Sequence, residues 1–164
     1  STFITISPSS VWFTKQFPKH KWIEFIDKVP ESIEIHLLGA FADKNYNDEI
    51  IDLSNRKSGI YNKAGKYTLL KSADLMQSAI MNFVNDSAPM HLCSAVNAPV
   101  CAVYCSTIPE FGFGPLSDIS HSIEVDEKLD CRPCGIHGHK ACPKGHFKCA
   151  EDIEIGKLIS ILKL

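Results

Sequence analysis

Short apolar runs separated by polar, turn-forming stretches recur along the chain. TFITIS at 2–7 alternates β-forming residues, and SIEIHLLG at 32–39 and VCAVY at 100–104 are similar runs bounded by turn signals. MNFVN at 81–85 is a further run of this kind, and we interpret the ambiguous pattern around residues 60–61 as a short edge strand. These runs predict the strands of one sheet.

Between these runs, apolar residues recur with the 3.6-residue period of amphipathic helices. In the stretch 19–29, Trp22, Phe25 and Ile26 share one face, whereas Glu24 and Lys28 lie on the other. Alternating strands and helices favour parallel pairing through right-handed crossovers. We therefore expect an α/β fold with a doubly wound, Rossmann-like parallel sheet. The other predicted helices cover residues 42–53, 69–79, 89–96 and 151–162.

Residues 106–150 interrupt this alternation, because they are rich in Gly, Pro, Cys and His and are too long for a simple connection. The 164 residues, 45% hydrophobic and 22% charged, fit one domain, 1–164, with a sizeable core. A formal net charge of −2 gives no indication of nucleic-acid binding, and no apolar run reaches the ~18 residues that cross a bilayer. Because the chain begins inside a predicted strand without an initiator Met, we expect it to be part of a longer protein.

Candidate chemistry lies in the loops that follow the strands, where doubly wound sheets bind their ligands. The first loop carries Ser9, Ser10 and Lys15, which offer two hydroxyls and a cation to a phosphate. Lys15 has an alternative interpretation as a solvated surface charge. The second loop carries Asp43, whose carboxylate is suited to the hydroxyls of a ribose.

The junction after residues 81–85 is the third candidate. Ser87 is an N-cap candidate and Pro89 suits the first helical position, so free N–H groups at this helix start would favour an anion. His91 would lie in the first turn, pointing back toward the same site. Asp86 and Ser87 have an alternative role as simple helix caps, and His91 has one as a half-buried structural histidine.

Four cysteines cluster with the spacing C-x₂-C-x₇-C-x₆-C. Four soft ligands could form a structural tetrahedral zinc site. With one C-x-x-C pair, however, we favour reduced thiols that pack, and the reducing cytoplasm disfavours disulfides. The four residues are Cys131, Cys134, Cys142 and Cys149.

Several motifs, in order, resemble the C-terminal half of glycosyltransferase family 9, the ADP-heptose:lipopolysaccharide heptosyltransferases. They are SPSSVWFTKQFP, LLGAFAD, FVNDSAPMHLCSAVNAPVCAVY and CRPCGIHGHKACPKGHFKC. The resemblance implies the GT-B architecture, in which two Rossmann-like domains face a cleft and the C-terminal domain binds the nucleotide sugar. A second, N-terminal domain would bind the acceptor.

The resemblance also implies roles for individual residues. Ser10 and Lys15 would contact the diphosphate, Asp43 the ribose and Tyr67 the adenine border. Asp86 would contact the sugar, with His91 at the same helix start. Ser87 and the backbone that follows it, at Ala88, would hold the phosphates; Ala88 stands where the family usually has Gly, and Phe17 where it usually has Trp.

By this resemblance, the donor is an ADP-sugar, with ADP-heptose as first candidate, and the acceptor is lipopolysaccharide core or a related lipid-linked glycan. Transfer is expected to invert the anomeric centre and to be independent of metal ions. Lys15, Asp86 and His91 would be the catalytic residues of this chain, and the base that deprotonates the acceptor would lie on the N-terminal domain. The fragment alone should be inactive. We expect it in the cytoplasm, at or near the cytoplasmic face of the inner membrane. Alternatives are a nucleotide-binding module without transferase activity and a zinc-organised interaction domain.

Overall fold

The structure, a computed structural model, describes residues 1–163; Leu164, the last residue of the predicted domain, lies outside them. Its centre is a six-stranded sheet in the order β3-β2-β1-β4-β5-β6, and every neighbouring pair is parallel. The predicted doubly wound α/β fold is confirmed. The strands are β1 (Phe3–Ser7), β2 (Glu34–Leu37), β3 (Ile60–Asn62), β4 (Met81–Asn85), β5 (Val100–Val103) and β6 (Ser120–Ile123).

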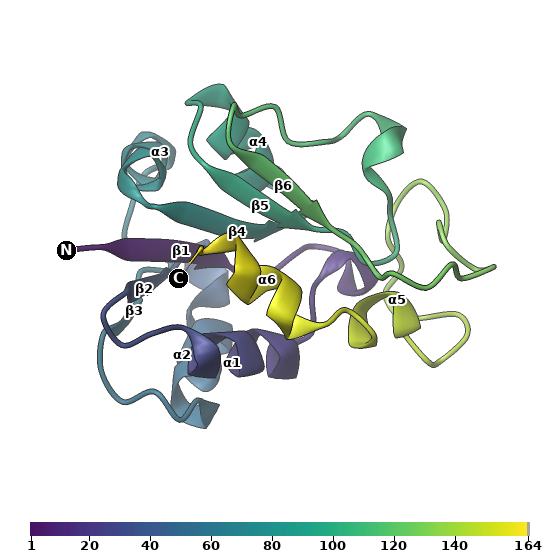
Figure 1. Ribbon diagram of the computed structural model, residues 1–164, viewed down its shortest axis with the longest axis horizontal. Coiled ribbons are helices and arrows are strands. Elements are labelled where there is room, and N and C mark those ends of the chain that lie inside the picture. Colours follow the sequence, from purple (N-terminus) through teal and green to yellow (C-terminus); the bar gives the residue numbers. More distant parts are fainter. Residues whose placement is uncertain (164) are drawn as a thin grey trace.

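Helices cover both faces of the sheet (Figure 1). On one face α1 packs against both α2 and α6, and on the other α3 packs against α4. The helices are α1 (Lys19–Lys28), α2 (Lys44–Leu53), α3 (Leu69–Ser78), α4 (Ala88–Ala95), α5 (Lys148–Glu151) and α6 (Ile155–Ile161); three short 3₁₀ turns are η1 (Phe13–Lys15), η2 (Phe41–Asp43) and η3 (Pro109–Phe111). Across residues 1–163, every helix is too short or too polar to traverse a lipid bilayer.

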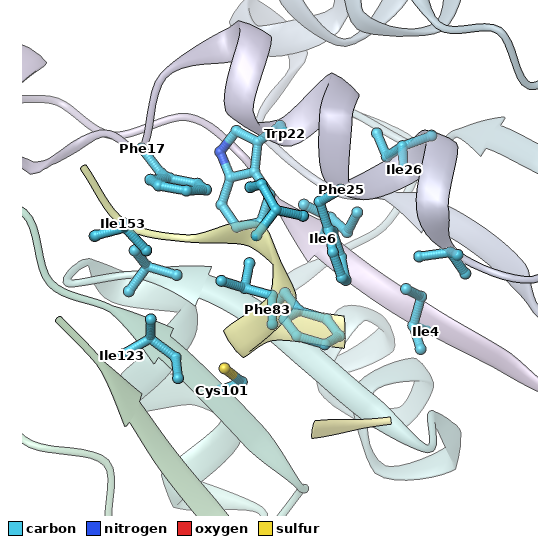
Figure 2. Packing of buried hydrophobic residues seen from close by; sticks show 14 of the residues in the cluster. Ile4, Ile6, Phe17, Trp22, Phe25, Ile26, Phe83, Cys101, Ile123 and Ile153 are labelled. Atoms are coloured by element: carbon cyan, nitrogen blue, oxygen red, sulfur yellow. The ribbon is translucent and has the colours of Figure 1, made fainter. Parts of the chain in front are cut away.

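Alternation of side chains along the strands divides the core into two layers. Phe83 of β4 faces the α1 side, where its ring lies 4.6 Å from that of Phe25, and Val84 faces the α4 side. Figure 2 shows the larger layer, in which the edge of Trp22 meets Phe17 at 5.1 Å between ring centroids. Phe17 is fully buried, so the aromatic residue at this position holds the first loop onto α1.

Two predictions about the C-terminal third were wrong. Residues 120–123, expected to be irregular, form β6 at the edge of the sheet, where two serines and a histidine give no apolar pattern. The helix predicted over 151–162 begins later, because α6 covers Ile155–Ile161 and residues 148–151 form a separate short helix, α5. Ile153 and Ile155 are both buried, and residues two apart on a helix face different directions. The break allows both side chains to enter the core.

The connections place the centre of the sheet at a switch point. From β1 the chain moves outward through β2 and β3, and it then returns to β4 on the other side of β1. In such sheets the loops beyond the carboxyl ends of the two central strands diverge to opposite faces and leave a crevice between them. The loops after β1 and β4 border this crevice.

Candidate functional site

A cleft of about 540 Å³ lies at the carboxyl edge of the sheet. The loops after β1 and β2 and the first turns of α3 and α4 form its walls, as expected for the switch point of a doubly wound sheet. Six predicted site residues line it together. They are Ser9, Ser10, Asp43, Tyr67, Ser87 and Ala88.

Asn85, the last residue of β4, holds the loop after β1. Its Nδ2 group donates toward the carbonyl oxygens of Pro8 at 3.1 Å and Ser9 at 3.4 Å, and its Oδ1 accepts from Phe17 N at 2.9 Å. Asn85 is fully buried. One amide side chain therefore fixes both ends of the loop that presents the serines. Its position between an apolar strand and Asp86 was the only signal of this role in the sequence.

A second set of bonds fixes the backbone at Ser10. Ser10 N donates to Gln16 Oε1 at 2.8 Å, and Gln16 Nε2 donates to the Tyr46 hydroxyl at 3.1 Å. Burial, with a smaller contribution from Glu49, raises the pKa of Tyr46 to about 12. The hydroxyl therefore stays neutral and joins this loop to α2.

Ser7, at the end of β1, is a site residue that the sequence analysis missed. It lines the cleft and is only 3% exposed, and its hydroxyl has no hydrogen-bond partner within residues 1–163. A buried hydroxyl without a partner is costly, on the order of 1–3 kcal/mol. This group is therefore a candidate to hydrogen-bond a ligand in the cleft.

Asp43 closes the wall on the β2 side. Its Oδ2 accepts a 2.8 Å hydrogen bond from Ala40 N, which fixes the carboxylate across the η2 turn. One oxygen is committed to this bond, and a carboxylate has lone pairs on a second oxygen for a ligand. Tyr67, before α3, lines the cleft as well, with Lys71 Nζ 5.4 Å from its ring centroid.

At the start of α4, the Ser87 side chain makes no capping hydrogen bond to the helix. Its hydroxyl instead donates weakly, at 3.4 Å, to Asn85 O. The helix begins at Ala88, so Pro89 is its second residue. We had predicted that Pro89 would be the first. The uncapped first turn faces the cleft through Ser87, Ala88 and Pro89, where its partial positive charge favours an anion.

Asp86 does not cap α4 either, because its carboxylate binds residues of two other segments. Asp86 Oδ2 lies 3.3 Å from Lys15 Nζ and accepts a 2.6 Å hydrogen bond from Thr107 Oγ1. The Asp86 side chain is 8% exposed and that of Lys15 20%. Lys15 is thus a partly buried, paired cation rather than a solvated one. Thr107 carries no motif that would have identified it.

His91 lies on the exposed side of α4. Its ring meets the edge of Phe113 with 6.3 Å between centroids. Within residues 1–163, Lys15, Asp86 and His91 are not among the residues that line the cleft. Lys15 belongs to the first loop and Asp86 to the β4–α4 junction, and both of these segments also contribute residues to the cleft walls. His91 lies about one helical turn beyond the start of α4.

The four clustered cysteines line a second, much smaller cavity of about 20 Å³. All are free thiols. As described, residues 1–163 show no group of three or more His, Cys, Asp or Glu side chains arranged to hold a metal ion. Burial by itself would raise the pKa of Cys142, but the nearby backbone N–H groups of residues 144–147 lower the pKa below its ordinary value.

The cysteine segment, residues 131–149, packs directly on the first loop (Figure 1). His139 N donates to Thr14 Oγ1 at 2.7 Å, and Thr14 N donates back to His139 O at 3.1 Å. Gly138 approaches so closely that a Cβ there would lie 2.4 Å from Trp12 Cβ and 2.9 Å from Lys15 Cγ. The position of Lys15 therefore depends on how this segment is held.

Comparison with known proteins places this arrangement in a family. The model of glycosyltransferase family 9 (heptosyltransferase) matches residues 1–141. Lipooligosaccharide heptosyltransferase 2 of Haemophilus influenzae is 28% identical over 116 residues, which cover 69% of this chain and 33% of that protein. The chain therefore spans only about a third of this curated relative.

Solved structures show the same fold. E. coli ADP-heptose LPS heptosyltransferase II has a TM-score of 0.80 at 22% identity, over 99% of this chain and 45% of that one. E. coli heptosyltransferase WaaC with ADP has a TM-score of 0.69 at 18% identity, over 98% of this chain and 43% of that one. Because the family model matches residues 1–141, which are most of this chain, the chain belongs to glycosyltransferase family 9, the heptosyltransferases.

Proposed function

We propose that the cleft binds an ADP-sugar, with ADP-heptose as the first candidate, and that this chain is the donor-binding half of a transferase acting on lipopolysaccharide core or a related glycan. The observation that carries the proposal is the composition of the cleft. Serine hydroxyls, an uncapped helix start and a fixed carboxylate converge at the switch point of the sheet. A relative of the same fold has been solved with ADP.

The diphosphate is assigned to the space between the first loop and α4. Ser9 and Ser10 offer hydroxyls there, and the buried hydroxyl of Ser7 gains the partner that it lacks. Ser87 and the backbone at Ala88 offer the helix start, whose partial charge of roughly half a unit attracts the phosphates.

The nucleoside is assigned to the wall formed by β2 and α3. The second oxygen of Asp43 would accept hydrogen bonds from the ribose hydroxyls, and the Tyr67 ring would border the adenine. The apolar side chains of Leu69 and Met76, which line the same wall, suit an aromatic base.

The sugar and the bond to be broken are assigned to the side of Asp86. Lys15 Nζ has three N–H donors, so it can keep its contact with Asp86 while a second N–H binds a phosphate oxygen. As the bond between the anomeric carbon and the diphosphate breaks, this cation and the helix start offset the charge on the departing ADP. His91, at the same helix, remains a candidate contact on the sugar side.

Inverting transfer also needs a base to deprotonate the acceptor hydroxyl as it attacks. We assign the base and the lipid-linked acceptor to a second domain, so the chain alone is inactive. Its own cation and amides take the role that a metal ion has in other transferases, which makes transfer metal-independent. Such a donor and acceptor meet in the cytoplasm, at the face of the inner membrane.

Titration calorimetry on the chain, with ADP, ADP-heptose and UDP, tests the proposal. We expect ADP and ADP-heptose to bind and UDP to bind more weakly, because the smaller uracil ring would cover less of the apolar wall at Tyr67, Leu69 and Met76. If neither ADP nor ADP-heptose binds, the proposal is overturned. Binding without transfer, in a protein that contains both domains, would instead identify a nucleotide-binding module.

A further inference from the structure

Large apolar side chains are exposed at the rim of the cleft, on its nucleoside side. Phe41, in η2, is 79% exposed, and Leu70, in the first turn of α3, is 82% exposed. A Cβ on Gly65 would lie 2.8 Å from Phe41 Cα, so the turn that precedes α3 packs directly on η2. Leu69 and Ala40, the chain neighbours of Leu70 and Phe41, line the same cleft. Exposed apolar side chains that gather in one place mark interaction sites.

Lysines surround these apolar residues. Residues 57–73 carry four lysines and no Asp or Glu, in a chain whose formal net charge is −2. Lys66 N donates to Lys63 O at 3.0 Å, so both belong to the tight turn that packs on η2. Lys71 is the third residue of α3. Phe41, Leu70 and these three lysines form what we call the rim patch.

The carboxylates near the rim patch leave its positive charge in place. Asp43 lines the cleft and accepts its hydrogen bond from a backbone N–H group. Asp48 Oδ2 lies 2.7 Å from Lys44 Nζ, so its charge is already paired. Asp74 follows Lys71 by three residues on α3, yet in the part of the chain that the structure describes none of the three patch lysines forms an ion pair.

Two of the patch lysines lie over tyrosine rings instead. Lys63 Nζ is 5.3 Å from the ring centroid of Tyr61, and Lys71 Nζ is 5.4 Å from that of Tyr67. A cation over an aromatic face is attracted to it without losing its charge. Lysine and tyrosine both combine an apolar body with a polar end, and such residues suit the boundary between lipid headgroups and acyl chains.

From this arrangement we propose that the rim patch binds the surface of a membrane that contains anionic phospholipids. Phe41 and Leu70 would enter the boundary below the headgroups, where burial of their exposed area is favourable. The three lysines would contact lipid phosphates, since an anionic membrane surface attracts basic side chains. A nucleic acid would use the lysines but not the aliphatic side chain of Leu70, so the combination favours a lipid surface.

The contact would also set the position of the cleft relative to the membrane. Because Leu69 lies between Leu70 and the cleft, the nucleoside rim would be held close to the lipid surface. A lipid-linked acceptor would then be presented near the donor. This consequence rests on the proposed function, whereas the membrane contact itself does not.

Vesicle sedimentation tests the proposal, with the protein in the absence of nucleotide. One set of vesicles contains phosphatidylcholine alone, and the other contains phosphatidylcholine and phosphatidylglycerol in equal parts. We expect binding to the mixed vesicles, much weaker binding to phosphatidylcholine, and a loss of affinity as salt is added, because salt screens exposed charges. The combined changes Lys63→Gln, Lys66→Gln and Lys71→Gln should weaken binding about a hundredfold, since each lysine at an anionic surface contributes about fivefold.

A second triple variant controls for net charge. Lys21→Gln, Lys28→Gln and Lys128→Gln remove the same charge from α1 and from the loop after β6, and should leave vesicle binding close to that of wild type. The double change Phe41→Ser and Leu70→Ser tests the apolar part and should weaken binding about tenfold or more. Circular dichroism shows whether each variant is folded; should the serine variant not fold, the lysine pair of variants still decides.

Three outcomes would overturn the proposal. They are no binding to the mixed vesicles, equal binding to both kinds of vesicle, and equal binding by the two triple lysine variants. Binding to single-stranded RNA without binding to vesicles would overturn it as well, and would assign the patch to a nucleic acid. Because the vesicle assay contains no nucleotide, a failure to bind ADP leaves its result unaffected.

Discussion

Lys15 Nζ lies 3.3 Å from Asp86 Oδ2, so an ion pair joins the loop after β1 to the junction after β4. These loops border the crevice on its two sides. The pair is partly buried, where a charge interaction is screened less by solvent than at the surface. The pair therefore links the two loops that border the cleft, and under the proposed function the cation would bind a phosphate and the carboxylate would bind hydroxyls.

We expect Lys15→Ala to weaken ADP binding. A charge-assisted hydrogen bond contributes roughly 1.5 to 3 kcal/mol, which corresponds to about a 10- to 150-fold higher Kd in calorimetry. Lys28→Ala is the matched control, because Lys28 is at the end of α1 and pairs with Glu24 on the surface. Equal ADP affinity in wild type and Lys15→Ala would remove Lys15 from the site.

Asp86→Asn separates contact with the sugar from contact with the nucleotide. The change removes a negative charge beside the proposed diphosphate, so the affinity for ADP should be kept or should rise. The additional affinity for ADP-heptose over ADP should be lost, because the carboxylate no longer accepts from the sugar hydroxyls. Calorimetry with both ligands measures this difference. A parallel loss for both ligands would assign Asp86 to the nucleotide or to folding alone.

Thr107→Val tests the support of Asp86 from outside the cleft. Valine keeps the shape of threonine but removes the 2.6 Å hydrogen bond to a buried carboxylate. We expect the free energy of unfolding in urea to fall by about 1.5 to 3 kcal/mol, whereas Thr107→Ser should retain most of it. If valine and serine variants are equally stable, the hydroxyl does not support Asp86.

Much of the fold could be predicted because its core signals are local. MNFVN is a fully buried strand, and its predicted bounds coincide with those of β4. The polar residues of β6 are different: they form a strand only because β5 offers an edge with which to pair. That pairing depends on residues about 20 positions away, which a local pattern does not contain.

The candidate site shows the same division. Loops that follow parallel strands must share one edge of the sheet, so Ser10, Asp43 and Ser87 could be expected to meet, and they line one cleft. The partners that fix the site could not be predicted. Thr107 reaches Asp86 from a segment without regular structure, and Ser7 is distinguished only by burial without a partner.

Asn85 and Asn82, both buried on β4, form a matched pair of test positions. Asn82 bonds to Met76 O and Pro99 O at the start of the strand, while Asn85 fixes the first loop at its end. Each change to Ala should lower the free energy of unfolding by about 1 to 3 kcal/mol. Only Asn85→Ala should also weaken ADP binding in calorimetry at a temperature where both variants are folded. Equal effects on ADP would show that Asn85 acts through stability alone.

His36 on β2 gives the protein a pH dependence with a definite sign. Its side chain is 13% exposed and lies between the rings of Phe3 and Tyr61, at 4.8 and 5.4 Å. Burial lowers the pKa of His36 below its ordinary value of 6.5, with a smaller contribution from Lys63 in the same direction, and the nearby Glu34 opposes the shift.

The unfolded chain therefore binds a proton at His36 at a higher pH than the folded chain does. The stability that depends on neutral His36 is therefore fully present above the pKa of His36 in the unfolded chain. It is lost as the pH falls through the pKa of His36 in the folded chain. We expect the free energy of unfolding to decrease as the pH falls below about 6.5, the ordinary pKa of His36, and His36→Phe, which keeps an aromatic ring, to reduce that slope. His137→Gln, a change at an exposed position, is the control and should retain it. Urea unfolding across the pH series measures both slopes, and identical slopes in wild type and His36→Phe would assign the dependence to other groups.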